Sequence, residues 1–341
     1  MRLSICIPTY NRGQFLPDLL ESIAQQTGHG CEIEVVVSDN ASTDDTPAVI
    51  ERFRSRLPRL IYRRHENNLG PDRNFLSAVE LASGDWCWLM GSDDVVETGA
   101  VARIERTLNA QPGIAGLSVE RVLYSFDLAS QRNSPPYDRA LFSSSRLLRG
   151  DREIFLSSAD YFGYLSGNVF DRQLWADVVA TSPVDQFYNA YVHVYVLGNM
   201  LKRRPAWYYL AEPCVRYRTD NDFFLGEGEY RRLEIDVLGY AAIVRALYGD
   251  DSPVTRQMDK RVGKHVFYRL LSAKLRGVTG DFYRRSLGLS FRHYRRSTVF
   301  WLAIVPAFAV PSVVVRGVRE VYRRTLRPLR LARLASRTAQ Q

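Results

Sequence analysis

Short apolar stretches alternate with amphipathic segments over the first 110 residues, and this alternation constrains the fold more than any other feature of the sequence. The apolar stretches are rich in Ile, Val, Leu and Trp, as are strands of a parallel sheet that is covered on both faces. They are residues 3–7, 33–37, 60–62 and 86–90. The segments between them place apolar residues at helical spacing. This order predicts an α/β fold with a doubly wound, mostly parallel sheet.

Polar side chains follow each predicted strand at the point where the strand ends. The carboxyl ends of parallel strands lie along one edge of the sheet, and ligands of such sheets bind there, so these clusters predict a single site. Each cluster taken alone has an ordinary alternative, namely a turn, a helix cap or a solvated acidic loop. The clusters are Pro8-Thr9-Tyr10-Asn11, Asp39-Asn40, Asn67-Asn68 and Asp93-Asp94.

The acidic residues in these clusters indicate the chemistry of the predicted site. Asp93 and Asp94 repel one another unless a cation or a donor group lies between them, and Mg²⁺ or Mn²⁺ bridges carboxylates to phosphate oxygens. Asp39 can accept a hydrogen bond from a nucleobase or a ribose hydroxyl if Ser42 or Thr43 caps the next helix. The sequence contains neither a Gly-x-Gly-x-x-Gly nor a Gly-x-x-x-x-Gly-Lys-Ser/Thr loop, which argues against common dinucleotide and nucleoside triphosphatase sites.

Together these stretches resemble the family 2 glycosyltransferases of the GT-A fold. The matching residues are 3–12, 35–46, 67–81 and 84–94. The segment Gly91-Ser92-Asp93-Asp94, with Leu69-Gly70-Pro71-Asp72-Arg73-Asn74 upstream, is most similar to the abequosyltransferase-like subgroup.

This resemblance implies roles for individual residues. Thr9 and Asp39 would contact the nucleotide base and ribose, and Asp93, with Asp94 beside it, would bind the metal. Gly91 departs from the family pattern, because the first aspartate of the Asp-x-Asp motif, which contacts the ribose, is usual there. The full set expected to bind the nucleotide sugar in these loops is Pro8, Thr9, Tyr10, Asn11, Asp39, Asn40, Asn68, Arg73, Asn74 and Ser92.

The family also places its catalytic base, usually an acidic residue, at the start of a helix in the second half of the domain. In this sequence His193 takes that position, and a neutral imidazole can accept a hydroxyl proton near neutral pH. A histidine packed among the neighbouring tyrosines is an equally good interpretation, and Asp185 is the alternative base. Arg216 and Arg218 would clamp the leaving diphosphate, unless they are ordinary surface arginines.

The second half of the chain is less regular. Residues 130–149 are polar and predict a long loop or flap, residues 167–170 and 207–210 predict strands, and residues 189–201 predict a helix. From residue 229 onward the pattern is mostly helical. We therefore expect a GT-A domain over 1–225, divided into a nucleotide-binding half (1–110) and an acceptor half (111–225), and a helical, basic, membrane-associating region over 226–341.

Basic residues concentrate in the last part of the chain. From residue 251 onward there are 20 Lys and Arg and 4 Asp and Glu, a net charge of +16, whereas the first 250 residues have a net charge of −7. Such a region favours an anionic partner, and a membrane is preferred because no nucleic-acid-binding module is recognisable. The four cysteines are far apart and lack companion histidines, so we expect no zinc site, no disulfide framework and a reducing compartment.

An apolar run over residues 299–315 lies within this basic region. It is shorter than the roughly 20 residues that a spanning helix needs, and Pro306 and Pro311 interrupt it. The run predicts an in-plane or re-entrant anchor in which Phe300, Trp301 and Phe308 insert, with a buried helix as the alternative. Since no signal peptide precedes the first predicted strand, we expect a cytoplasmic protein, peripheral or monotopic on the inner face of the plasma membrane.

These expectations combine into one hypothesis of function. The protein would transfer a sugar from a nucleotide-diphosphate sugar to a lipid-linked glycan acceptor, with Mg²⁺ or Mn²⁺ as cofactor, in cell-surface polysaccharide synthesis of the O-antigen or capsule type. A sugar-nucleotidyltransferase is one alternative, although such enzymes usually begin with a glycine-rich basic loop. A degenerate sugar-nucleotide-binding protein is the other, because Gly91 and His193 depart from the family pattern.

Overall fold

The computed structural model describes residues 1–132, 142–278, 280–322 and 324. The chain forms two compact units, Met1–Asp222 with Arg245–Leu247, and Phe223–Val244 with the residues from Tyr248 onward. The division after Asp222 lies close to the one expected after residue 225. Each unit is described by itself.

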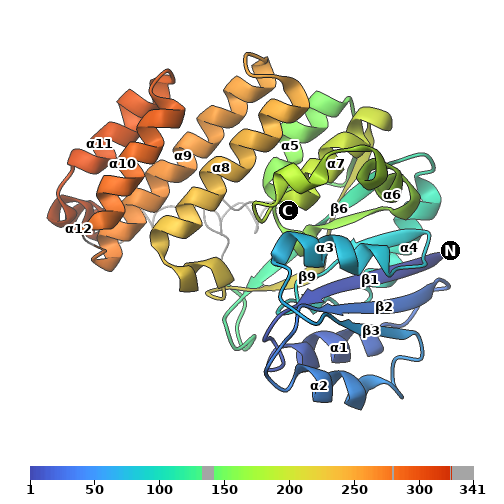
Figure 1. The fold of residues 1–341 in the computed structure, drawn as a ribbon. Coiled ribbons are helices and arrows are strands. Elements are labelled where there is room, and N and C mark those ends of the chain that lie inside the picture. Colours follow the sequence, from blue (N-terminus) through green and yellow to red (C-terminus); the bar gives the residue numbers. More distant parts are fainter. Residues whose placement is uncertain (133–141, 279, 323, 325–341) are drawn as a thin grey trace, which may run out of the picture. The chain divides into compact units, whose positions relative to one another are not determined.

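The first unit is built on one mixed sheet, whose described strands have the order β3-β2-β1-β4-β8-β6-β9-β5, with β7 paired to β9. The strands β3, β2, β1 and β4 are parallel (Figure 1), as the sequence predicts, whereas β8 is antiparallel to both β4 and β6. The bounds are β1 Arg2–Thr9, β2 Glu32–Asp39, β3 Leu60–Arg64, β4 Trp86–Leu89, β5 Val95–Val96, β6 Gly116–Tyr124, β7 Arg146–Arg149, β8 Asn168–Asp171 and β9 Ala206–Arg218.

Helices cover this sheet, and local sequence explains where several of them begin. Pro17 and Pro71 stand in the first turns of α1 and α3, where the missing proline N–H costs nothing because it would have no helical partner. Gly70 precedes α3 with φ 82°, a conformation that glycine adopts without strain. The bounds are α1 Leu16–Ala24, α2 Thr46–Phe53, α3 Pro71–Glu80, α4 Ala100–Ala110, α5 Asp151–Phe162, α6 Arg172–Thr181 and α7 Val192–Arg203.

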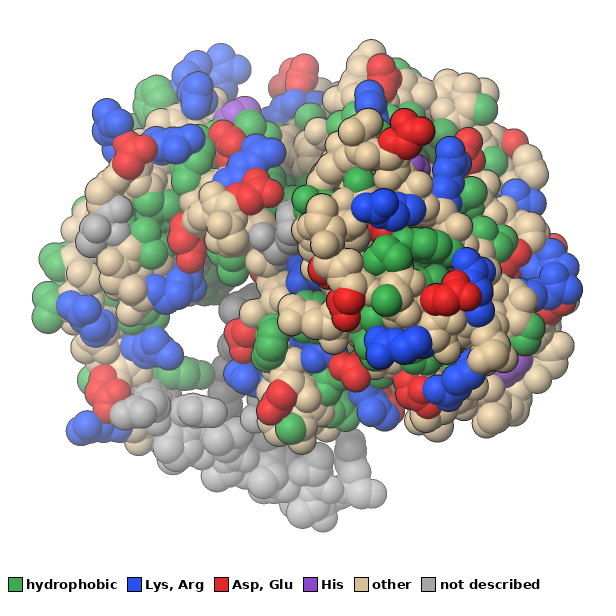
Figure 2. Space-filling model, turned by 60° about the horizontal axis from the view of Figure 1, so that its bottom comes forward, with side chains coloured by type: hydrophobic (Ala, Val, Ile, Leu, Met, Phe, Trp, Pro, Cys, Tyr) green, Lys and Arg blue, Asp and Glu red, His purple; other side chains and the backbone are tan. Residues whose placement is uncertain are grey.

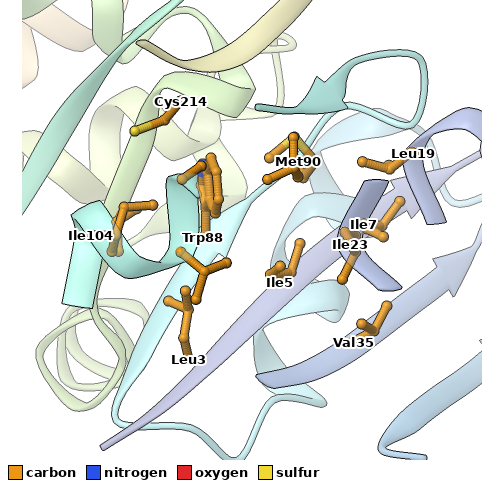
Figure 3. Packing of buried hydrophobic residues seen from close by; sticks show 14 of the residues in the cluster. Leu3, Ile5, Ile7, Leu19, Ile23, Val35, Trp88, Met90, Ile104 and Cys214 are labelled. Atoms are coloured by element: carbon orange, nitrogen blue, oxygen red, sulfur yellow. The ribbon is translucent and has the colours of Figure 1, made fainter. Parts of the chain in front are cut away.

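The core of the first unit forms where α1 and its neighbours pack on the strands (Figure 3). Leu3, Ile5 and Ile7 alternate along β1 and reach the same face of the sheet, where they belong to one buried cluster with Leu19 and Ile23 of α1. All of these side chains are buried. The burial of β1 on both faces explains why its sequence is apolar with almost no alternation.

The acceptor half differs from the sequence expectation in two places. The predicted flap over 130–149 is only partly described, because residues 133–141 lie outside the described residues, and its end forms β7, antiparallel to β9. Only Leu148 of this short strand is buried, so its sequence carries no strand pattern. The strand predicted at 207–210 continues as β9 to Arg218. On the face seen in Figure 2, basic and acidic side chains of this unit are interspersed.

The second unit is helical, as predicted. Leu233 and Val237 of α8, Val266 and Leu270 of α9, and Leu289 of α10 form its buried core. The described helices are α8 Glu229–Tyr248, α9 Pro253–Arg276, α10 Asp281–Tyr294, α11 Val305–Ala309 and α12 Ser312–Val321, and a π-helical turn covers Phe300–Ile304.

The apolar run of the second unit is broken into short helices. No helix among the described residues is long and apolar enough to cross a membrane, but Phe300–Ala309 and Ser312–Val321 pass that test together as a pair bent by 103°. At the break, the ammonium group of Lys274 donates hydrogen bonds to the carbonyls of Phe308, at 2.9 Å, and Val310. This buried lysine thus satisfies carbonyls that the end of α11 leaves without helical partners.

Candidate active site

Side chains join the loops that follow β1, β2 and β3. Asn11, which has a left-handed backbone (φ 51°), accepts a hydrogen bond from the backbone N–H of Thr43 at 2.8 Å. Asn40 donates to Oδ1 of Asn68 at 2.8 Å and accepts from the backbone N–H of Leu69 at 2.8 Å. The polar clusters predicted from three separate strand ends therefore lie together at one edge of the sheet.

Asp39 shapes the loop after β2. Its side chain is fully buried, Oδ1 accepts from the N–H of Ser42 at 2.9 Å, and Oδ2 accepts from the hydroxyl of Tyr62 at 2.7 Å. The expectation that Ser42 or Thr43 caps the next helix is wrong, because Asp44 accepts from the N–H of Thr46 at 3.1 Å instead. In this structure one oxygen of Asp39 binds the loop itself and the other binds Tyr62 of β3.

Thr9 ends β1 with an unsatisfied hydroxyl. The side chain is 2% exposed, and Oγ1 has no hydrogen-bond partner among the residues that the structure describes. The backbone carbonyl of Thr9 accepts from Nδ2 of Asn74 at 3.2 Å. A buried hydroxyl without a partner is uncommon in folded proteins, and water or a bound polar group can supply the missing partner. Pro8 beside it is buried, and Tyr10 is partly exposed.

The first turn of α3 connects this edge to α7. Asn74 accepts from Oγ of Ser38 at 2.8 Å, and the exposed Arg73 places its guanidinium 5.3 Å from the ring centroid of Tyr188. Asp72 accepts from the N–H of Ala190 at 2.7 Å and from that of Val192 at 2.9 Å. Sequence reasoning missed this role of Asp72, because its two bonds reach residues that are 118 and 120 positions away along the chain.

The two acids after β4 have different environments. Asp94 is buried, and its Oδ2 accepts from the hydroxyls of Tyr164 at 2.7 Å and Ser166 at 2.5 Å. Its Oδ1 accepts from the backbone N–H of Arg218 at 3.2 Å. Burial and the neighbouring charge of Asp93 raise the pKa of Asp94 to about 7. Both carboxylate oxygens of Asp94 are therefore bound within the protein.

Asp93 is partly exposed and is oriented by a residue from the end of the first unit. Its Oδ2 accepts from Nδ2 of Asn221 at 2.6 Å. Burial raises the pKa of Asp93, while the positive charge of Arg12 opposes the rise. Arg12 also donates to Oδ1 of Asn221 at 3.1 Å. Sequence reasoning missed these roles, because Arg12 only ends the matching segment 3–12 and Asn221 lies outside every matching segment.

Gly91 lies close to the acid pair, and a side chain at this position would be crowded. A Cβ at this position would lie 3.2 Å from Oγ of Ser166, 3.3 Å from Oδ1 of Asp93 and 3.4 Å from Oδ2 of Asp94. Any larger side chain would therefore press on these oxygens. The departure from the family motif is matched by the crowding around it. Ser92, the next residue, is buried.

The two arginines expected to clamp a diphosphate have protein partners. Arg218 is 4% exposed and donates to the carbonyl of Asp93 at 2.8 Å, to that of Phe126 at 2.6 Å and to Asp18 at 2.7 Å. Arg216 makes two bonds to Glu97, at 2.5 Å and 3.0 Å. Arg218 thus holds the backbone of the loop that carries Asp93 and Asp94 by a bond to the Asp93 carbonyl. This contact differs from the expected contact with phosphate.

The two candidate bases are placed differently. His193 lies in the first turn of α7, is 2% exposed, and its ring nitrogens have no hydrogen-bond partners within the described chain. Its ring packs edge-on against Phe75, at 5.5 Å between centroids. Burial lowers the pKa of His193 to about 4. The packed interpretation fits this placement, because a base must reach the acceptor hydroxyl. Asp185 is exposed on the turn Val184–Phe187.

This chain is similar to known glycosyltransferases. The model of the family described as glycosyl transferase family 2 matches residues 4–170. The chain is 35% identical over 272 residues to abequosyltransferase RfbV of Salmonella typhimurium, covering 76% of this chain and 79% of that protein. It is 30% identical over 109 residues to the GalNAc(5)-diNAcBac-PP-undecaprenol beta-1,3-glucosyltransferase of Campylobacter jejuni, covering 32% of this chain and 35% of that one.

A solved structure shows the same fold. The crystal structure of Staphylococcus aureus TarS 1–349 in complex with UDP-GlcNAc aligns with a TM-score of 0.60 and 19% identity, over 95% of this chain and 92% of that one. This likeness confirms the predicted GT-A type fold. The extent and identity of the match to the Salmonella protein, together with the family match over the nucleotide-binding half, settle the classification. The chain belongs to the family 2 glycosyltransferases.

Proposed function

We propose that this protein transfers a sugar from a nucleotide-diphosphate sugar to a lipid-linked glycan during synthesis of a cell-surface polysaccharide. The observation that carries the proposal is the placement of Asp93, a partly exposed carboxylate held by Asn221 at the end of β4. The unsatisfied hydroxyl of Thr9 lies at the end of β1, the neighbour of β4 in the sheet. The match to the family model and the similarity to the Salmonella abequosyltransferase support the reaction class.

Asp93 is the residue that would hold a divalent metal ion. The described residues contain no group of three or more His, Cys, Asp or Glu side chains that could hold a metal by themselves. Mg²⁺ commonly needs only one or two protein carboxylates, because substrate phosphates and water supply its other ligands. The partly exposed carboxylate of Asp93 fits such an arrangement. The ion would neutralise charge on the departing diphosphate.

The chain's own residues would bind and orient the donor. Thr9 would offer its unpaired hydroxyl to the nucleoside, and the bonds of Asp39 and Asn40 would hold the surrounding loops in shape. Arg12 and Arg218 would favour the ionised form of Asp93, since both positive charges lower its pKa. Asp185, which is exposed, is the better of the two candidates for taking the acceptor proton.

The lipid-linked acceptor is proposed from the second unit and from one relative. The printed name of the Campylobacter protein describes an undecaprenol-linked substrate. In this chain, Val313, Val314, Val318 and Val321 of α12 are all exposed. At about 100° per residue they fall on one side of the helix, whereas Arg316 and Arg319 fall on the other. Such a helix lies in the plane of an anionic membrane surface.

The residues that would enter the membrane differ from those expected from the sequence. Phe300 is 2% exposed and belongs to the buried core of the second unit, so it does not insert. Trp301 and Leu302, on the same π-helical turn, are 57% and 79% exposed. We propose that these two residues and the valine side of α12 form the membrane-binding surface of the protein, and that the protein is a peripheral membrane protein.

Product analysis tests the proposed reaction. The full-length protein is incubated with UDP-, GDP-, CDP- and dTDP-sugars, Mn²⁺ and a bacterial lipid-linked glycan extract, and the released products are separated. Release of a nucleoside diphosphate with glycosylation of the extract is expected. Release of pyrophosphate would identify a nucleotidyltransferase, and tight binding without any product would identify a degenerate binding protein. Either of these outcomes overturns the proposal.

A further inference from the structure

The first turn of α3 contacts three other segments of the first unit. Asn74 bonds to the carbonyl of Thr9 and to the hydroxyl of Ser38, at the ends of β1 and β2. Arg73 stacks over Tyr188. Asp72 binds two backbone N–H groups at the beginning of α7, one of them 120 residues away along the chain. A single helical turn therefore links the nucleotide edge of the sheet to the start of α7.

The contacts of Asp72 replace a cap that α7 lacks. The residue at the N-cap position of α7 makes no side-chain capping bond. The first N–H groups of a helix have no helical partners, and a carboxylate there gains from both hydrogen bonding and the helix dipole. Here the carboxylate comes from a different helix and is 4% exposed. The bond must therefore fix where α7 begins relative to α3.

The backbone next to α7 needs this support. Ala190 has φ 71°, a left-handed conformation that is strained for a residue with a side chain. Its N–H is one of the two that Asp72 binds, at 2.7 Å. A strained turn of this kind persists where surrounding contacts determine it. Without Asp72, the segment from Tyr188 to Val192 would lose two hydrogen bonds to the first turn of α3.

We infer that Asp72 is a positioning residue of the transfer reaction, which holds the start of α7 and the preceding turn, with Asp185 and Tyr188, at a fixed place relative to the nucleotide edge. The inference rests on the proposed function, because it concerns the group that takes the acceptor proton. A displacement of about 1 Å in such a segment can reduce a rate by 10²-fold, even when substrate binding is preserved.

The test compares Asp72→Asn with Asp171→Asn in the full-length protein. Asp171 caps α6 in the same unit by accepting from the N–H of Leu174 at 2.9 Å, so it controls for the same change of carboxylate to amide at an ordinary cap. Three quantities are measured: affinity for UDP, GDP and CDP with Mn²⁺ by calorimetry, amide hydrogen exchange over residues 188–193, and turnover of the most active sugar nucleotide in the panel. Asp72→Glu, which keeps a carboxylate that can accept from two N–H groups, is the second variant.

We expect Asp72→Asn to reduce turnover at least about tenfold and to speed amide exchange at residues 190–192, with nucleotide affinity changed less than about threefold. Asp72→Glu should recover part of the turnover, and Asp171→Asn should keep it. Three outcomes overturn the inference: unchanged turnover in Asp72→Asn, a loss fully explained by weaker nucleotide binding, or an equal loss in Asp171→Asn.

A failure of the proposed function can be told apart from a failure of this inference. If the wild-type protein binds nucleoside diphosphates but turns over no sugar nucleotide, the proposed function fails. Exchange then decides the role of Asp72: bound nucleotide must slow exchange at residues 188–193 in the wild type and not in Asp72→Asn. Equal protection in both proteins contradicts the positioning role.

Discussion

Asn221 donates a hydrogen bond from Nδ2 to Oδ2 of Asp93 across 2.6 Å, although 128 residues separate them in the sequence. The residue comes directly after β9, and β9 reaches the acid loop through Arg218. The end of the first unit therefore orients the carboxylate that the family resemblance assigns to metal. Partners of a metal ligand are worth about 10–100-fold in metal affinity, so Asn221 belongs to the proposed metal site.

Asp93→Asn should remove metal-dependent turnover. The amide keeps the bond geometry but loses the negative charge that would hold a divalent ion, so we expect nucleoside diphosphate release to fall at least about 10²-fold. Asn221→Ala should retain turnover at saturating Mn²⁺ but require about 10–100-fold more of it. Metal titrations of both variants check this. Full activity of Asp93→Asn, or of the wild type in excess chelator, contradicts the metal assignment.

His193→Leu should change the pH dependence of stability and leave turnover intact. Burial lowers the pKa of His193 to about 4, below its ordinary 6.5, so between these values the unfolded chain binds more protons than the folded one. Stability is therefore full above pH 6.5 and declines as the pH falls toward 4. The leucine variant lacks this loss, and its advantage should reach roughly 3 kcal/mol near pH 4.

Urea unfolding at several pH values measures this difference, and turnover is assayed at pH 7.5. Asp185→Asn is the companion variant, because Asp185 is exposed where His193 is buried. A base contributes typically 10²–10⁴-fold to the rate, so we expect Asp185→Asn to lose activity on that scale. A normally folded His193→Leu protein with a comparable loss would restore the histidine to the role of base.

Arg218→Lys should destabilise the first unit much more than Arg216→Lys. A lysine cannot reach the three acceptors that the buried guanidinium of Arg218 satisfies, and leaving them without donors should cost about 2 kcal/mol or more. The more exposed pair of Arg216 and Glu97 contributes less, about 1 kcal/mol or below. Thermal unfolding of the two variants measures the difference. Equal melting temperatures would show that Arg218 is free to act on a substrate.

Val318→Asp should weaken binding to anionic membranes. Val318 is 65% exposed on the valine side of α12, so the substitution leaves the fold intact while placing a charge where lipid would lie. We expect partitioning into phosphatidylglycerol vesicles to fall at least about tenfold. Leu238→Asp on α8, also exposed, adds the same charge elsewhere in the second unit and serves as the control. Equal binding by the two variants and the wild type would contradict the proposed surface.

Much of the fold followed from local sequence. The apolar stretches of β1 and β2 are buried on both faces and have no other stable environment, so their parallel pairing was predictable. The polar clusters at their ends were predictable for the same reason, because the pairing brings them to one edge. By contrast, β7 has one buried residue and depends on β9 for its existence, and no local pattern indicates it.

Residue type and the spacing within single elements were enough to predict the parallel strands β3, β2, β1 and β4, their polar edge and the family. Only the tertiary structure decided which members of that edge present free groups. Asp94 and Arg218 match the pattern of site residues as well as Asp93 does, yet both are saturated by partners from distant segments. Asp72 became visible only through its bonds to α7. Hydrogen-bond partners more than 50 residues apart are set by the packing of elements, and a linear pattern does not record them.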